Sequence, residues 1–178
     1  MFSDGFSIDQ LTEADFAPLV EPLFREYGLW VMGRLEADLG LRFGEDDLER
    51  AHEEFRLELP KLVGPGGRLL LARAGGEGIG VATLKPVDAA IAEVKRMYVR
   101  PEARGRGVAR ALLQRLVEDA RAEGYRTVRL ESLRFMTEAH ALYRSLGFVD
   151  VKVFEGSESA MVGLEGAACF MELELSPG

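Results

Sequence analysis

The sequence has few of the residues that would indicate secretion, metal binding or membrane insertion. It contains one cysteine, Cys169, so no disulfide can form within the chain, in agreement with a reducing compartment. Two histidines and one cysteine offer no zinc-site spacing, and we expect no metal. No apolar run approaches the length of a membrane span, and no basic segment precedes an apolar one at the start. We therefore expect a cytoplasmic protein with no membrane partner.

Positive charge is also scarce, because the formal net charge is −8. A negative field repels nucleic acid, so we expect no nucleic-acid partner. The basic residues are nevertheless concentrated in one segment, in which five arginines fall within fifteen residues. Such a segment favours a bound anion, although a solvated run of charges would have the same composition. The five are Arg96, Arg100, Arg104, Arg106 and Arg110.

Hydrophobic periodicity predicts one domain over residues 5–175, of the α/β (α+β) class. We expect a mixed, mostly antiparallel sheet of about seven strands flanked by about four helices. One pair of strands is joined through a helix and should be parallel. Because proline breaks helices, the second helix should stop at Pro60. The expected strands are 5–11, 68–74, 79–84, 89–99, 127–133, 148–154 and 167–175, and the helices are 12–32, 46–59, 107–123 and 137–146.

Residues 97–109 form the segment with the clearest chemistry: a strand, a turn with two glycines and an amphipathic helix. The first N–H groups of a helix have no intrahelical partner and, with the helix dipole, bind phosphate. Glycine lets an anion approach the backbone, and Arg104 and Arg106 add charged hydrogen bonds. The dinucleotide fingerprint is excluded by Arg110, and the P-loop by the lack of any Gly-Lys pair.

Two stretches carry a family resemblance. Residues 104–109 resemble the acetyl-CoA signature of the GNAT superfamily of N-acetyltransferases, Q/R-x-x-G-x-G/A, and residues 141–148 resemble its second hallmark, Leu-Tyr before Gly-Phe. The chain is also similar to a bacterial subgroup of small, poorly characterised GNAT proteins. The resemblance implies the GNAT fold, in which the parallel central strands, here 89–99 and 127–133, splay apart. It also implies acetyl-CoA as co-substrate.

The resemblance assigns the cofactor contacts to the strand and the turn that follows it. Backbone groups of Met97, Tyr98 and Val99 would bond the pantetheine arm. Arg100 or Arg110 could reach the 3′-phosphate, and the sequence does not choose between them. Many family members have an asparagine against the cofactor arm where this chain has Met136. The pyrophosphate would be held by Arg104, Gly105, Arg106, Gly107, Val108 and Ala109.

Three residues are candidates for the chemistry. Tyr143 matches the family tyrosine that bonds the CoA sulfur and protonates the departing thiolate, and a phenol with a pKa of about 10 suits that role. Glu93, eleven residues before Arg104, matches the catalytic glutamate of histone-acetylating members. Glu131, on the neighbouring strand, is the second candidate for the base. Each has a simpler alternative: a packed aromatic for Tyr143, and a paired or solvent-facing carboxylate for the two glutamates.

The expected reaction is acetyl transfer from acetyl-CoA to a primary amine of a small molecule, by direct attack in a ternary complex. The lack of a credible Cys or Ser nucleophile agrees with direct attack. One alternative is a protein or peptide N-acetyltransferase, which needs a groove that the loop 155–166 would either close or leave open. Another is a non-catalytic acyl-CoA-binding sensor. Homodimers are common in the family, but no sequence feature decides the oligomeric state.

Overall fold

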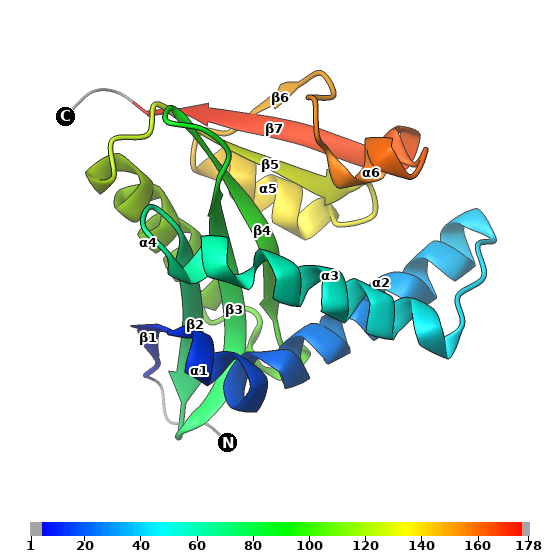
Figure 1. Cartoon of the computed structure of the whole chain (residues 1–178), viewed down its shortest axis with the longest axis horizontal. Helices are drawn as coiled ribbons and strands as arrows, with labels where there is room; N and C mark the ends of the chain where they lie inside the picture. The colour runs from blue at the N-terminus through cyan, green and yellow to red at the C-terminus, as the bar shows by residue number, and fades with distance from the viewer. Residues whose placement is uncertain (1–4, 176–178) are drawn as a thin grey trace.

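The computed structural model describes residues 5–175. Within this range all seven strands join one sheet (Figure 1). The strand order is β1-β2-β3-β4-β5-β7-β6. The pair β4–β5 is parallel, and every other recorded pair is antiparallel. The expected mixed, mostly antiparallel sheet is therefore confirmed. The strands are β1 (Ser7–Gln10), β2 (Arg68–Ala74), β3 (Glu77–Pro86), β4 (Ile91–Val99), β5 (Thr127–Leu133), β6 (Val149–Val151) and β7 (Ala168–Glu174).

Helices cover both faces of the sheet, each over its own hydrophobic cluster. On one face, α2 (Glu21–Leu39) and α3 (Glu45–Val63) pack on β2, β3 and β4. On the other face lie α4 (Val108–Ala122) and α5 (Thr137–Ser145). Helix α4 binds the sheet through a stripe of buried leucines and valines spaced at three and four residues. Among residues 5–175, no helix combines the length and apolar composition that a membrane crossing requires.

The parallel strands β4 and β5 separate about halfway along their length. Their pairing ends at Val94 and Leu130, after which β5 stays with β7 and β4 stays with β3. A bulge in β4 accompanies the parting, because two residues of β4 oppose one of β3 and Arg96 has a φ of 52°. The expected splay is thus present. We call residues 95–99 of β4 and 131–133 of β5 the fork.

The two N-terminal helices differ from the expectation. The predicted helix 12–32 is interrupted by a π-helical turn at Phe16–Val20, which contains Pro18, and then continues to Leu39. The expectation that the next helix stops at Pro60 was wrong, because α3 runs on to Val63. Burial explains the extra turn: Leu62 has no exposed surface and lies in the cluster against β2 and β3. Packing of one leucine outweighs the single hydrogen bond that proline removes.

The C-terminal part is less regular than expected. The predicted strand 148–154 is limited to the three residues of β6. The loop 155–166 contains a short helix, α6 (Glu158–Met161), and a 3₁₀ turn begins at Glu165. Helix α6 and the residues before it fold back toward β4 and β5, with consequences for the site described next.

Candidate functional site

The turn before α4 is shaped by two glycines. Gly105 has a φ of 74°, and Gly107, the N-cap of α4, has a φ of 80°, a conformation that other residues adopt at a cost. A Cβ added at either glycine would meet nothing within 4 Å, so the space in front of the turn is open. Buried Val108 fixes the start of the helix against the core. The first-turn N–H groups of α4 therefore face open space, as a phosphate site requires.

The arginines around this turn have different partners. Arg104 donates from Nε to the carbonyl of Val99 at 3.1 Å, and its guanidinium lies 5.8 Å from the ring centroid of Trp30. Arg100 turns toward α2, where it forms two hydrogen bonds to Glu26 at 2.6 and 3.0 Å. Arg110 is exposed and donates to Ser145 on α5 at 2.9 Å. Of the two candidates for the 3′-phosphate, Arg110 is therefore the more accessible.

Residues 97–99 place one backbone edge at the fork. Val99 and Tyr98 pair with β3 on their other side, whereas the pairing of β4 with β5 has already ended at Val94. Met97 packs against the cluster beneath α4, so it belongs to the core as well as to the fork. A strand edge without a neighbouring strand can accept an added one, which is the role expected for these three residues, although the carbonyl of Val99 already accepts a hydrogen bond from Arg104.

Tyr143 lies on the α4/α5 face of the sheet. It is 6% exposed and belongs to the same hydrophobic cluster as Val94 and Leu130, the last paired residues of β4 and β5. Its ring centroid is 6.0 Å from that of Phe148. Burial raises the pKa of Tyr143 well above the ordinary value, and the phenol of Tyr27 raises it further. A phenol is protonated at neutral pH without this shift, and the raised pKa makes Tyr143 a weaker acid than an ordinary phenol.

Tyr27 approaches from the opposite face, and the sequence analysis did not identify it. It lies on α2 with its ring centroid 5.6 Å from that of Tyr98, and burial raises its pKa, which nearby Arg96 partly offsets. The phenol of Tyr27 contributes to the raised pKa of Tyr143 although the two residues pack in clusters on different faces of the sheet. The spacing of Tyr27 from Phe24 is typical of a core stripe, so no sequence signal marks it as a site residue.

Glu93 lies on the α2/α3 face in a buried ion pair. Its carboxylate accepts a hydrogen bond from Arg129 Nε at 2.9 Å, and the two side chains are 7% and 11% exposed. The guanidinium of Arg129 lies 4.0 Å from the ring centroid of Phe154 and also donates to the carbonyl of Glu155. Glu93 is thus the partner of a buried cation, which is the structural alternative stated for it above.

Glu131 is on the same face but at the fork itself. Strand alternation points Leu130 toward α5 and Glu131 away from it. The two carboxylate oxygens accept hydrogen bonds from the backbone N–H groups of Glu158 and Ser159, both at 2.8 Å. The structure therefore brings Glu93 and Glu131 to one face of the fork and Tyr143 to the other.

A third acidic residue on this face, Glu158 of α6, also escaped the sequence analysis. It binds Lys95 at 2.6 Å and accepts two hydrogen bonds from Arg96 at 3.0 and 3.2 Å. Burial alone would raise the pKa of Glu158, but Arg96 and Lys95 outweigh burial and hold the pKa at about 2. We call Lys95, Arg96 and Glu158 the ionic clasp. Arg96 and Glu158 are 62 residues apart in sequence, and no local pattern links them.

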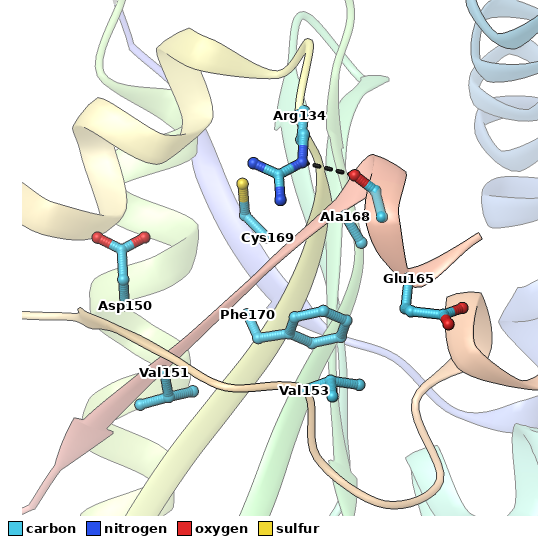
Figure 2. Close-up of a pocket in the computed structure, with 9 residues that line it drawn as sticks. Arg134, Asp150, Val151, Val153, Glu165, Ala168, Cys169 and Phe170 are labelled. Atoms are coloured by element: carbon cyan, nitrogen blue, oxygen red, sulfur yellow. Dashed lines mark hydrogen bonds between the residues drawn. The ribbon is translucent and has the colours of Figure 1, made fainter. Parts of the chain in front are cut away.

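Two shallow hollows lie beside the fork rather than in it. Figure 2 shows the first, of about 390 Å³, where Arg134 donates to the carbonyl of Gly166 near Asp150 and Cys169. Cys169 is half-buried there. The second, of about 400 Å³, lies between the end of α2 and Phe135. None of the predicted site residues lines either hollow.

Comparisons with known proteins agree with this geometry. Residues 34–148 match the model of the Acetyltransferase (GNAT) family. An IAA acetyltransferase of Azospirillum brasilense is 38% identical over 105 residues, which are 58% of this chain and 69% of that protein. The uncharacterised N-acetyltransferase YjgM of Escherichia coli is 31% identical over 135 residues, 74% of this chain and 73% of its own length.

The fold is similar to solved structures as well. A crystal structure of PaiA N-acetyltransferase from Thermoplasma acidophilum, in complex with coenzyme A, superposes with a TM-score of 0.71. The match covers 96% of this chain and 99% of that one, at 21% sequence identity. At such identity the likeness concerns the fold, and it extends across both faces of the sheet.

Proposed function

The chain belongs to the GNAT family of acetyltransferases, and on that premise we propose that it acetylates a primary amine of a small molecule by direct attack in a ternary complex. Family membership makes it an acetyl-CoA-dependent N-acetyltransferase with the GNAT fold. The size of the acceptor, the direct attack and the roles of individual residues are the parts that we propose.

The residues at the turn and the fork fit acetyl-CoA. The turn at residues 104–109 has two glycines of positive φ, open space in front of them and arginines on both sides. The free edge of residues 97–99 would take the pantetheine arm, and exposed Arg110 would take the 3′-phosphate. When bound, acetyl-CoA supplies an acetyl group activated as a thioester. The chain itself has to place that group at the fork and move two protons.

One observation supports the mechanism above the others: Tyr143 and the carboxylates lie on opposite faces of the fork. Tyr143, a phenol that is protonated at neutral pH, would donate its proton to the departing sulfur from the α5 side. A carboxylate on the other side would accept a proton from the acceptor ammonium, directly or through a water, and leave a neutral amine to attack the thioester carbonyl. The second proton, which the nitrogen loses as the amide forms, would replace the one that Tyr143 gives to the sulfur. The acid then acts on the sulfur of the breaking C–S bond and the base on the nitrogen of the forming C–N bond. Because they lie on opposite faces, no proton passes directly between them.

Of the two carboxylates, we favour Glu131 as the base. Glu93 is held by Arg129 in a buried pair, and protonating it would leave a buried cation without its partner. The carboxylate of Glu131 accepts hydrogen bonds from backbone N–H groups of α6, which orient it at the fork. Within the described part of the chain, no cationic side chain holds it as Arg129 holds Glu93. Glu93 would then keep the strand and Arg129 in place.

The position of α6 supports a small acceptor over a peptide. Glu131 binds the start of α6, and Lys95 and Arg96 bind its first side chain, so the segment lies across the α2/α3 side of the fork. A peptide would need an open groove along that side, whereas a small amine needs only a gap between α6 and α2. The peptide alternative is thereby less favoured.

The test combines binding with turnover. Acetyl-CoA should raise the midpoint of thermal unfolding, because it binds the folded state. Release of CoA thiol should follow with small amines and not with a library of lysine- and amine-terminated peptides. Release with the peptides alone would replace the small-molecule proposal by the peptide alternative. A shift of the midpoint with no release from any amine would overturn acetyl transfer to amines altogether.

A further inference from the structure

We propose that Lys95 and Arg96 form the binding site for a carboxylate of the acceptor, and that Glu158 occupies this site in the free protein. The acceptor would accordingly be an amine that also carries a carboxylate, as amino acids do. This inference rests on the proposed function, because it names the substrate class of the same site.

The ionic clasp already has the chemistry of a ligand site. The carboxylate of Glu158 receives two hydrogen bonds from the guanidinium of Arg96, at 3.0 and 3.2 Å, and lies 2.6 Å from the Nζ of Lys95. A planar guanidinium fork with an added ammonium is the usual donor set for a free carboxylate. Glu158 thus shows where a carboxylate is held and by which groups.

The place of these donors in the fold points to the acceptor. Lys95 follows Val94, the last residue of β4 that pairs with β5, and Arg96 is the bulged residue that turns β4 away. Both side chains reach the α2/α3 face, on which Glu131 lies. An amine that attacks at the fork from this face would therefore have its neighbouring carboxylate within the range of Lys95 and Arg96.

Glu158 is the exchangeable member of the clasp. Lys95 and Arg96 belong to a central strand and are largely buried, with side chains 8% and 25% exposed. Glu158 is 39% exposed and belongs to a four-residue helix within a loop. Buried cations are costly without a counter-ion, so some carboxylate must remain with them. A ligand carboxylate can supply that charge while Glu158 moves into solvent, and Glu58, 3.5 Å from Lys95, would remain as its second counter-charge.

The first experiment needs no variant. Acetyl-CoA turnover is measured with pairs of acceptors that differ only in the carboxylate: each amino acid against its amide. We expect kcat/KM to be about 100-fold higher for at least one acid than for its amide, since a lost bond between buried charges has about that effect.

Variants then locate the carboxylate. Arg96→Met should raise KM for the acid by about 100-fold and bring the ratio of kcat/KM for the acid to that for its amide close to one. Glu158→Gln should lower KM for the acid, because it removes the competing carboxylate. The matched control is Lys85→Met, which removes a half-buried cation that also pairs with Glu58 on the same face but does not contact Glu158. The control should change neither KM.

The N-acetylated product supplies a readout that is independent of turnover. It should raise the unfolding midpoint of Glu158→Gln more than that of the unaltered protein, and it should not raise that of Arg96→Met. Amides acetylated as well as acids, or KM for the acid unchanged in Arg96→Met, would overturn the carboxylate site and leave the proposed function standing. Failure of every amine, with acetyl-CoA still bound, would overturn both.

Discussion

The two faces of the fork are held together by different kinds of interaction. On the α4/α5 face, the glycine turn belongs to the unit formed by β4, the turn and α4, and the buried phenol of Tyr143 belongs to the short helix α5. Each of these features depends on residues that are neighbours in sequence. On the α2/α3 face, charged side chains from β4, β5 and α6 hold one another. Under the proposed function, the first face would bind acetyl-CoA and the second the acceptor amine.

The contrast has a physical basis. Backbone N–H groups present the same donors whatever the side chains are, so a phosphate site made from them is insensitive to most substitutions. Side-chain ion pairs depend on each partner, and removing one leaves a buried charge alone. Removing one partner of a buried ion pair on the α2/α3 face, such as Glu93, should therefore cost stability, whereas removing the Tyr143 hydroxyl on the α4/α5 face should alter the chemical step. The following experiments examine that difference.

The largest effect should come from Tyr143→Phe. Loss of the proton donor should lower kcat by about 10²–10³-fold, with little change in the KM for acetyl-CoA, because the hydroxyl acts on the leaving sulfur and not on binding. Steady-state kinetics measure both constants. Tyr125→Phe is the matched control: Tyr125 is also a buried tyrosine of the same cluster, but its hydroxyl donates to the carbonyl of Gly66. An unchanged kcat in Tyr143→Phe would reduce Tyr143 to a packed aromatic.

The two glutamates should separate stability from chemistry. Glu93→Gln leaves Arg129 buried without its counter-charge, so we expect a loss of about 3 kcal/mol in the free energy of unfolding. Glu131→Gln should lose less stability and more kcat, because it removes the proposed base. Denaturant unfolding and steady-state kinetics on both variants distinguish the roles.

A double variant provides the control for this pair. In Glu93→Gln/Arg129→Gln the stranded cation is gone, so part of the lost stability should return. If Glu93→Gln were as stable as the unaltered protein but inactive, Glu93 would be the base and our preference for Glu131 would be wrong.

How much the sequence predicts follows the same division. The positions of β2 and β5, the turn at residues 104–109 and the placement of Tyr143 on a short helix are local consequences of periodicity, glycine and helix caps, and the structure has them. The ionic clasp is not local, because Arg96 and Glu158 meet only after the chain has folded across 62 residues. Tyr27 has the sequence spacing of a core residue. Its effect on the pKa of Tyr143 depends on the tertiary arrangement of two distant helices, which no local pattern predicts.

The glycine turn offers a comparison within one helix. Gly107→Ala and Gly124→Ala each place a Cβ at a residue of positive φ, with φ of 80° and 88°, at opposite ends of α4. Each should lower the free energy of unfolding by about 1–2 kcal/mol, because the strain is the same. Only Gly107→Ala should raise the KM for acetyl-CoA, by about tenfold, since only that end of α4 lies at the proposed phosphate site. Equal KM values in both variants would remove the phosphate site from the start of α4.

The smallest effect concerns pH and the α2/α3 face. The pKa of Glu158 is lowered from 4.5 to about 2, so its contribution to stability is complete above pH 4.5 and is lost as the pH falls toward 2. Because the side chain is 39% exposed, we expect that contribution to be only about 1–2 kcal/mol. The stability difference between the unaltered protein and Glu158→Gln should be constant near neutral pH and shrink in that acid window. Denaturant unfolding at a series of pH values measures it.

The control for this last experiment is Glu165→Gln, the same substitution at an exposed residue of the neighbouring 3₁₀ turn, which should show no such loss. The two curves together decide what holds α6 over the fork. If the difference for Glu158→Gln did not change between pH 4.5 and 2, the cations would not be stabilising the carboxylate. The segment would then be held by its backbone bonds to Glu131, and the α2/α3 face would be as dependent on backbone as the other. A loss confined to that window would instead show that α6 is held there by charge, which a competing carboxylate can replace.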